Sequence, residues 1–277
     1  MDVLFLNNNL DLNKKIFILG AFESFHKGHY KIYEQALKLA ADPNDIVLVA
    51  VKEPASLPKT NSLKFMQLNN RLEAFANVGI ETVVLYEFST VQNYDGKKFL
   101  ETLSSNPDSI FIAGKDFKFG RFAANNFDDI KKWYPNSLEI NIEQFNNSKI
   151  STSLLKSQLE YGQIDFINEL LFANYSITIK MDELNFFEYP KELIPLHRGI
   201  YLTYLIKDEE KIPSYILVKN EKSYITNLLD FKLFPSGEYT VEIIKTHRIV
   251  IADYKEKITE DEIKLIKSNF IDLQNPI

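Results

Sequence analysis

Two histidines flank a glycine shortly after an apolar run near the N-terminus. His26, Gly28 and His29 follow the run IFIL (16–19) within the segment GAFESFHKGH (20–29). A strand that leads through a tight turn into a helix directs unpaired backbone N–H groups and the positive end of the helix dipole at the turn. Two imidazoles converge on the same turn, where a glycine leaves the backbone accessible. The segment 20–29 is therefore predicted to bind phosphate groups.

Two other interpretations of this segment stay open. His26 and His29 can serve as structural caps at a strand–helix turn without binding any ligand. A metal site is the less favoured alternative, because the chain has no cysteine and Glu23 is the only carboxylate at an obvious partner spacing. The strand–turn–helix context favours phosphate binding.

Composition narrows the classes of function. The chain has 277 residues, 45% of them hydrophobic, which is enough for one large or two ordinary domains. Its net charge of −6 argues against a non-specific electrostatic interaction with nucleic acid, and the absence of cysteine excludes disulfides, thiolate zinc sites and a cysteine nucleophile. No apolar run approaches the roughly 18 residues of a membrane span. We expect a globular cytoplasmic protein without membrane or nucleic-acid partners, and its oligomeric state stays open.

The N-terminal part alternates short apolar runs with helix-period segments, a pattern typical of βαβ units and a parallel sheet. One helix is predicted after Gly28 and another from about 153 to 172. The clearest helix is capped by Ser62, and its apolar residues recur every three to four positions at Phe65, Leu68, Leu72, Phe75 and Ala76. The predicted strands are 16–19, 46–51, 82–86, 109–113 and 137–141. Residues 1–174 are thus predicted to form a Rossmann-like α/β domain.

After about residue 174 the sequence pattern changes, and segments rich in β-forming residues predominate. Residues 175–277 are predicted to form a smaller, mostly β domain that closes with a helix over 258–273, capped by Thr259 or Asp261. The charged run 207–211 is interpreted as a solvated hairpin turn. The predicted strands of this domain include 175–180, 199–206, 214–218 and 238–244.

The phosphate-binding segment also carries a family resemblance. GAFESFHKGH resembles the signature of the HxGH nucleotidyltransferases, and in particular G-x-F-D-G-x-H-x-G-H of the bacterial bifunctional riboflavin kinase/FAD synthetases. The sequence departs from that signature at Glu23 and Ser24, where the family has Asp and Gly. It keeps the signature at Gly20, Phe22, His26, Gly28 and His29.

Two further segments extend the resemblance. IFIAGKDFKFG (110–120) resembles V-G-x-D-F-R-F-G, although taken alone it is better interpreted as a strand and turn with core phenylalanines. ISTSLLK (150–156) resembles I-S-S-T-R-I-R, but the two arginines are replaced by Leu154 and Lys156. Leu154 removes one phosphate-binding cation. Lys156 keeps a positive charge but lacks the bidentate fork of arginine, so its binding to phosphate is expected to be weaker.

The resemblance implies an FMN adenylyltransferase that transfers AMP from ATP, with Mg²⁺, to FMN and releases FAD and pyrophosphate. No metal ligand in the protein is assigned. His26, His29 and Lys156 are implied as the catalytic residues. The implied ATP-binding residues are Gly20, Phe22, Gly28, Ser151, Thr152 and Ser153, and those of a flavin or nucleotide pocket are Gly114, Asp116 and Phe119.

The C-terminal domain resembles the riboflavin kinase β-barrel of the same enzymes but departs from it at its chemistry. The family's glycine-rich phosphate loop is missing from 180–199, and Ile225 stands where the family has its catalytic glutamate. We therefore expect a degenerate domain without kinase activity. The alternatives for the whole chain are a noncatalytic flavin- or nucleotide-binding protein, or adenylyl or cytidylyl transfer to another phosphate acceptor such as nicotinamide mononucleotide or phosphopantetheine.

Overall fold

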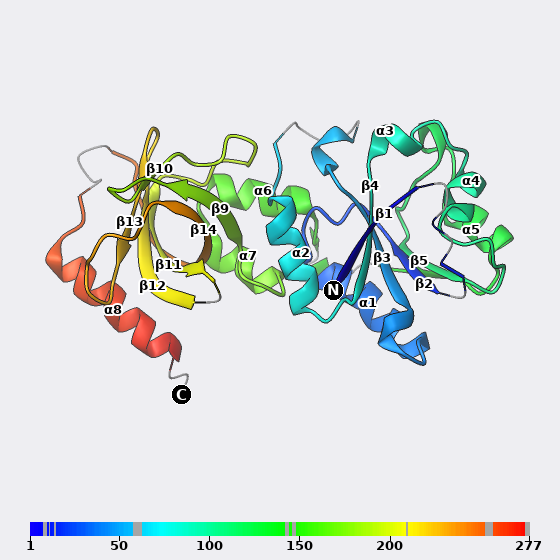
Figure 1. Cartoon of the computed structure of the whole chain (residues 1–277), viewed down its shortest axis with the longest axis horizontal. Helices are drawn as coiled ribbons and strands as arrows, with labels where there is room; N and C mark the ends of the chain where they lie inside the picture. The colour runs from blue at the N-terminus through cyan, green and yellow to red at the C-terminus, as the bar shows by residue number, and fades with distance from the viewer. Residues whose placement is uncertain are drawn as a thin grey trace. The chain divides into compact units, whose positions relative to one another are not determined.

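The computed structural model describes residues 1–7, 10, 12–13, 15–57, 63–141, 144–145, 148–208, 210–252 and 257–274. These residues form two compact units (Figure 1). The first contains residues 1–64 and 71–151, and the second contains 65–70 and 152–277. The functional division between 174 and 175 stays a prediction.

A six-stranded parallel sheet forms the first unit, which confirms the predicted α/β class. Its strand order is β1-β4-β3-β2-β5-β6. The three central strands β2, β3 and β4 coincide with the predicted runs because they are almost wholly buried, and such strands are continuous apolar runs. The bounds of the strands are β1 Asp2–Phe5, β2 Ile16–Leu19, β3 Ile46–Val51, β4 Thr82–Tyr86, β5 Ile110–Gly114 and β6 Leu138–Ile140.

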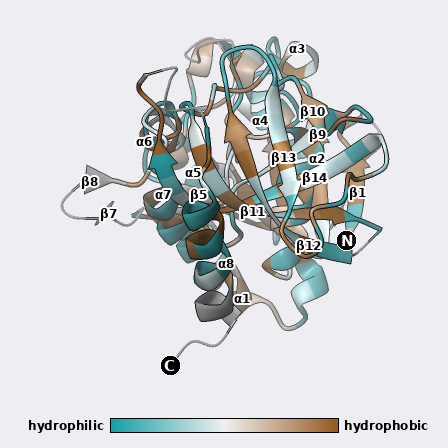
Figure 2. Cartoon of the chain, turned by 90° about the vertical axis from the view of Figure 1, so that its left-hand side faces the viewer, coloured by the Kyte–Doolittle hydropathy of each residue, from teal (hydrophilic) through white to brown (hydrophobic). Residues whose placement is uncertain are grey.

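Helices connect these strands, whose central members are buried and apolar. Across the whole chain, strands carry much of the hydrophobic colour and helices show hydrophilic faces (Figure 2). Phe17 and Phe111 stack on adjacent strands at 4.9 Å and belong to one hydrophobic core cluster of this unit. The α-helices of this unit are α1 Lys27–Leu39, α3 Phe88–Val91, α4 Gly96–Glu101, α5 Phe127–Trp133 and, from Arg71 onward, α2 Leu68–Asn77. Short 3-10 helices occur at η1 Pro43–Asp45, η2 Pro54–Ser56 and η3 Arg121–Ala123, and β7 Gln144–Phe145 pairs with β8 Ser148–Lys149 as a small hairpin.

Helix α2 differs in detail from its prediction. It begins at Leu68, so Phe65 precedes it, and the proposed cap Ser62 lies outside the described residues. Ala76 is exposed, whereas the fully buried face carries Asn70 and Arg71. The apolar spacing located the helix, and Phe75 is buried as the spacing indicated, but the polar residues Asn70 and Arg71 are buried as well.

The second unit is built on a closed barrel with strand order β10-β13-β12-β11-β14-β9, which confirms the predicted β class. Its longest strand, β14, has 13 residues and shows two register shifts against β11, a feature that bends strands so that a barrel can close. The run 207–211 lies at the hairpin between β11 and β12, as predicted, with Glu209 outside the described residues. The strands are β9 Ser176–Met181, β10 Phe186–Phe187, β11 Gly199–Lys207, β12 Glu210–Val218, β13 Ser223–Asn227 and β14 Gly237–Ile249.

The single helix predicted over 153–172 is wrong. The structure has two helices instead, α6 Thr152–Glu160 and α7 Ile164–Leu170, separated by Gly162 with a φ of +68°. A Cβ at this position would lie 2.5 Å from Ile249 and 2.6 Å from the hydroxyl of Tyr201, and the Gly162 carbonyl accepts a hydrogen bond from Thr246 at 2.6 Å. The break is therefore fixed by packing against the barrel.

The last helix, α8 Glu260–Gln274, lies along the outside of the barrel (Figure 1). The Thr259 hydroxyl accepts from the N–H of Glu262 at 3.2 Å, and the Glu262 carboxylate accepts from the N–H of Thr259 at 2.9 Å. This reciprocal pair is a capping box and confirms Thr259 as the cap, whereas Asp261 lies inside the helix. Ile266 and Phe270 pack onto barrel residues of β11 and β12. Within the described part of the chain, no helix is both long and apolar enough to span a membrane.

Candidate functional site

The predicted phosphate-binding segment and the segment predicted for a flavin or nucleotide pocket follow adjacent strands of the first unit. β2 pairs in parallel with β5, so 20–29 and 115–126 both begin at the carboxyl edge of the sheet, side by side (Figure 1). From β2 the chain passes to β3 on one side, whereas β5 pairs on the other side, which makes the β2–β5 boundary the topological switch point. Open α/β sheets bind ligands at such a point, outside the carboxyl ends of the strands.

His26 caps helix α1 with its side chain. Its backbone is extended, with φ −98° and ψ 170°, and its Nδ1 accepts a hydrogen bond from the N–H of His29 at 3.3 Å. Because Nδ1 is the acceptor, the proton of the neutral ring resides on Nε2. The capping role that sequence reasoning left open is therefore present. The cap uses Nδ1 of the ring, so a capping role does not exclude a phosphate-binding role for His26.

The two imidazoles form one stacked pair. The centroids of His26 and His29 are 3.7 Å apart with an interplanar angle of 15°. His26 is buried, whereas His29 is half-buried and meets the edge of the Phe22 ring at 4.8 Å. The rings thus share one environment at the start of α1, as the phosphate hypothesis requires.

The turn between β2 and α1 is tightly packed. A Cβ on Gly20 would lie 2.7 and 2.8 Å from ring atoms of Phe22, which is itself only 1% exposed. Phe22 has a φ of +47°, a left-handed conformation that is unfavourable for a residue with a side chain. Gly28 lies buried in the first turn of α1. Gly20 and Phe22 therefore shape the turn that presents the histidines.

Arg71 is a site residue that the sequence reasoning missed. Its side chain is 1% exposed and donates hydrogen bonds to the carbonyls of Phe22 at 2.9 Å and Ala21 at 3.4 Å, and to those of Val51 at 2.8 Å and Lys52 at 3.0 Å. Burial lowers the pKa of Arg71 to about 10, and the nearby carboxylates Glu23 and Glu53 oppose that shift. The sequence contains one signal that could have identified Arg71, because this arginine lies among the regularly spaced apolar residues of α2.

The segment after β5 contains the three residues predicted for a flavin or nucleotide pocket. Gly114 ends β5 and is buried, and Asp116 is exposed. Phe119 is 7% exposed and packs in the core near Phe99, at a ring distance of 6.2 Å. Phe119 is therefore a core phenylalanine, as expected from the interpretation of this motif as a strand and turn. The role of the three residues in a flavin or nucleotide pocket stays a prediction.

A second set of hydrogen bonds fixes the end of this segment. The Asn125 side chain accepts from the N–H of Gly96 at 3.1 Å and donates to Asp129 at 3.1 Å. Asp129 also accepts from the N–H of Asn126 at 3.0 Å, which completes a capping box at the start of α5. These hydrogen bonds hold the pKa of Asp129 below its usual value.

The predicted hydroxyls and cation of 150–156 lie at the start of α6. Ser151 precedes the helix, Thr152 is its first residue, and Ser153 is exposed. Lys156 is 8% exposed. Thr152, Ser153 and Lys156 belong to the second compact unit and His26 to the first, so their grouping into one site stays a prediction.

The described residues contain no group of three or more histidine or carboxylate side chains that could hold a metal ion. The metal-site alternative at Glu23 therefore lacks a ligand set among the described residues. Mg²⁺ prefers to keep water ligands and to bind through substrate phosphates. The binding of Mg²⁺ together with ATP stays a prediction.

Comparison with known families decides the assignment. Residues 9–158, more than half of the chain, match the model of the family described as FAD synthetase. The chain belongs to the FAD synthetase family. This membership confirms the predicted enzyme class, a nucleotidyltransferase, and the matched range includes both loops at the switch point and the start of α6.

Curated relatives of this FAD synthetase family member are similar over part of their length. A Listeria monocytogenes protein named bifunctional riboflavin kinase/FMN adenylyltransferase is 23% identical over 60% of this chain and 56% of its own length. A Buchnera aphidicola protein of the same name is 23% identical over 66% of each chain. A Geobacillus thermodenitrificans protein, whose name adds the word "Putative" to this description, is 24% identical over 57% of this chain and 89% of its own length.

A solved structure resembles the family member over its whole length. The crystal structure titled Macrolide-efflux Protein from Streptococcus pneumoniae matches with a TM-score of 0.76, covers 100% of both chains and is 16% identical in sequence. At this identity the similarity concerns the fold alone. The combination of a parallel-sheet unit with a barrel unit is therefore shared by another solved protein.

Proposed function

We propose that this protein transfers the AMP group of ATP to FMN and so produces FAD and pyrophosphate. An oxygen of the FMN phosphate attacks the α-phosphorus of ATP, the new P–O bond forms, and the bond to the bridging oxygen of pyrophosphate breaks. The attacking phosphate is already ionised at neutral pH, so no strong general base is needed. Catalysis then depends on positioning the phosphates and on neutralising the charge that develops on pyrophosphate.

The observation that carries this proposal is the stacked pair of His26 and His29 at the β2–β5 switch point. The stacked rings of His26 and of the half-buried His29 are proposed to bind the triphosphate, and the N-terminus of α1 adds its dipole. Ser151, Ser153 and Lys156 are proposed to bind the outer phosphates. Gly114, Asp116 and Phe119 stay proposed for the flavin or nucleotide pocket.

The proposal is tested by incubating the purified protein with FMN, ATP and Mg²⁺ and measuring FAD and pyrophosphate. We expect both products in equal amounts, and His29→Ala is expected to abolish turnover while it keeps the fold. FMN or ATP binding without pyrophosphate release would instead establish the noncatalytic binding alternative. Pyrophosphate release only with nicotinamide mononucleotide or phosphopantetheine, or only with CTP, would establish transfer to another acceptor or of another nucleotide.

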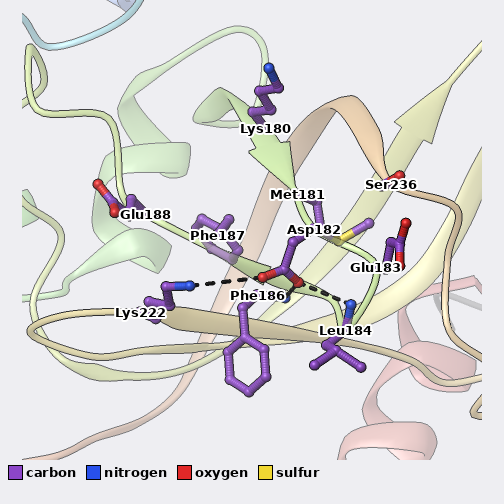
Figure 3. A pocket seen from close by; sticks show the side chains of 10 residues that line it. All are labelled: Lys180, Met181, Asp182, Glu183, Leu184, Phe186, Phe187, Glu188, Lys222 and Ser236. Atoms are coloured by element: carbon purple, nitrogen blue, oxygen red, sulfur yellow. Dashed lines mark hydrogen bonds and ion pairs between the residues drawn. The ribbon is translucent and has the colours of Figure 1, made fainter.

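We also propose that the barrel unit lacks riboflavin kinase activity. The stretch 180–199 occupies the place of the family's glycine-rich loop, and part of it lines an open groove of about 810 Å³ (Figure 3). The side chain of Asp182 accepts from the N–H groups of Leu184 and Phe186, at 3.0 and 2.9 Å, and lies 3.9 Å from Lys222. The groove is lined by Lys180, Met181, Asp182, Glu183, Leu184, Phe186, Phe187, Glu188, Lys222 and Ser236.

The charges of this groove are unsuited to ATP. Three carboxylates outnumber two amines among its lining residues, and the turn uses its backbone N–H groups to bind Asp182. Ile225, at the position of the family's glutamate, is 0% exposed in β13 and pairs with Ile216. An isoleucine cannot accept the proton of the riboflavin hydroxyl. Formation of FMN from riboflavin and ATP, by protein that is active with FMN, would refute the loss of kinase activity.

A further inference from the structure

The guanidinium of Arg71 joins two separate backbone segments of the first unit. Two of its acceptors, the carbonyls of Ala21 and Phe22, belong to the turn that precedes His26. The other two, the carbonyls of Val51 and Lys52, belong to the carboxyl end of β3. Arginine presents five N–H donors in a rigid planar fork, and here at least four hydrogen bonds use that geometry. The turn is thereby tied to the edge of the sheet.

The turn requires such a tie because its backbone is unfavourable without one. Phe22 has a φ of +47°, and a left-handed conformation at a bulky residue persists only where the surroundings enforce it. The Phe22 ring is buried against Phe25 at 6.2 Å, Phe75 at 6.5 Å and His29 at 4.8 Å. A shift of Phe22 would therefore be transmitted directly to the stacked imidazoles.

We propose that Arg71 is a positioning residue for adenylyl transfer, which fixes the strained turn so that His26 and His29 keep their stacked, phosphate-binding arrangement. The inference rests on the proposed function, since the arrangement matters only if these rings bind a polyphosphate. Arg71 itself acts through the turn and contacts no substrate. Its charge persists at neutral pH, because even the lowered pKa of about 10 leaves the group protonated.

The variant Arg71→Lys distinguishes a positioning role of Arg71 from a role in protein stability alone. A lysine keeps the positive charge but has a single nitrogen, which cannot reach carbonyls on both segments with the geometry of a fork. We expect kcat/KM for FAD formation to fall about 10²-fold, the loss typical of a misplacement of about 1 Å in a catalytic site. The matched control is Tyr134→Phe, which removes a buried hydrogen bond of 2.8 Å to the Ser104 carbonyl elsewhere in the same unit.

Imidazole ¹⁵N signals supply a readout that does not depend on turnover. The chain has four histidines, and two of them, His197 and His247, lie in the second unit. In folded Arg71→Lys the signals of His26 and His29 are expected to move, whereas those of His197 and His247 stay and Tyr134→Phe changes none. Unchanged His26 and His29 signals, or wild-type kcat/KM, in folded Arg71→Lys would overturn the inference. If the wild-type protein itself produces no FAD, the proposed function fails, and the imidazole signals still decide whether Arg71 positions the rings.

Hydrogen exchange in the wild-type protein covers the case in which Arg71→Lys does not fold. The Nε–H of Arg71 donates to the Phe22 carbonyl in a fully buried position, so its exchange is expected to be far slower than that of the exposed Arg121. Slow exchange supports the tie between turn and sheet. Exchange as fast as that of Arg121 overturns it.

Discussion

Gly20→Ala tests whether the packing of the turn before α1 is required for activity. The added Cβ would lie 2.7 and 2.8 Å from ring atoms of Phe22. That ring is 1% exposed and enclosed by Phe25, Phe75 and His29, so it has no free space into which to move. Overpacking of this kind costs about 1–3 kcal/mol of unfolding free energy. Because the displaced ring contacts His29, we also expect kcat/KM to fall by about 10²-fold.

The matched control for this variant is Gly79→Ala. Gly79 has a φ of +86°, so an alanine there costs about 1–2 kcal/mol through its backbone, yet the nearest atom to the new Cβ is the Tyr33 hydroxyl at 3.7 Å. Both variants should lose similar stability in denaturant titrations, and only Gly20→Ala should lose FAD formation. A folded Gly20→Ala with wild-type turnover would refute the idea that the tight turn positions the histidines.

Two capping boxes give further predictions. Asp129→Ala should lower the unfolding free energy by about 1 kcal/mol at neutral pH, because it removes the acceptor of Asn125 and of the Asn126 N–H. The pKa of Asp129 is depressed in the folded state, so its contribution to stability is present at pH values above the usual pKa of 3.8 and is lost as the pH falls below 3.8. A difference in stability between wild type and Asp129→Ala that persists at lower pH would contradict this prediction. Thr259→Ala should cost about 1 kcal/mol by removing the cap of the Glu262 N–H without changing FAD formation, as thermal unfolding and turnover assays will show.

Most of the parallel sheet was predictable because its strands are buried on both faces. Such strands read as unbroken apolar runs, and β2, β3 and β4 have the predicted bounds. β1 was not predicted because it is a four-residue edge strand whose ends are exposed. The break at Gly162 was missed for another reason, since it is set by Ile249 and Tyr201, residues distant in sequence.

The candidate site was predictable in its local parts and unpredictable in its assembly. His26, Gly28 and His29 are near neighbours in sequence, so their spacing, between an apolar run and a helical pattern, indicated a strand–turn–helix site. The strand order that places β5 beside β2 depends on pairings more than 90 residues apart. Arg71 escaped notice because an arginine in an apolar stripe has no visible partner in the sequence, and its acceptors are backbone carbonyls that carry no residue-type signal.

The spacing of the two histidines follows from helix geometry as much as from ligand chemistry. A side chain at the N-cap accepts most readily from the N–H groups two or three residues later, and His29 is three residues after His26. The same spacing places both rings on one face of the first turn, where they stack at 3.7 Å. Because the cap occupies Nδ1 of His26, the ring is held in one orientation with its remaining N–H fixed. Capping therefore fixes the orientation of the ring that we propose as a phosphate-binding group, so the structural role of His26 is compatible with the proposed ligand-binding role.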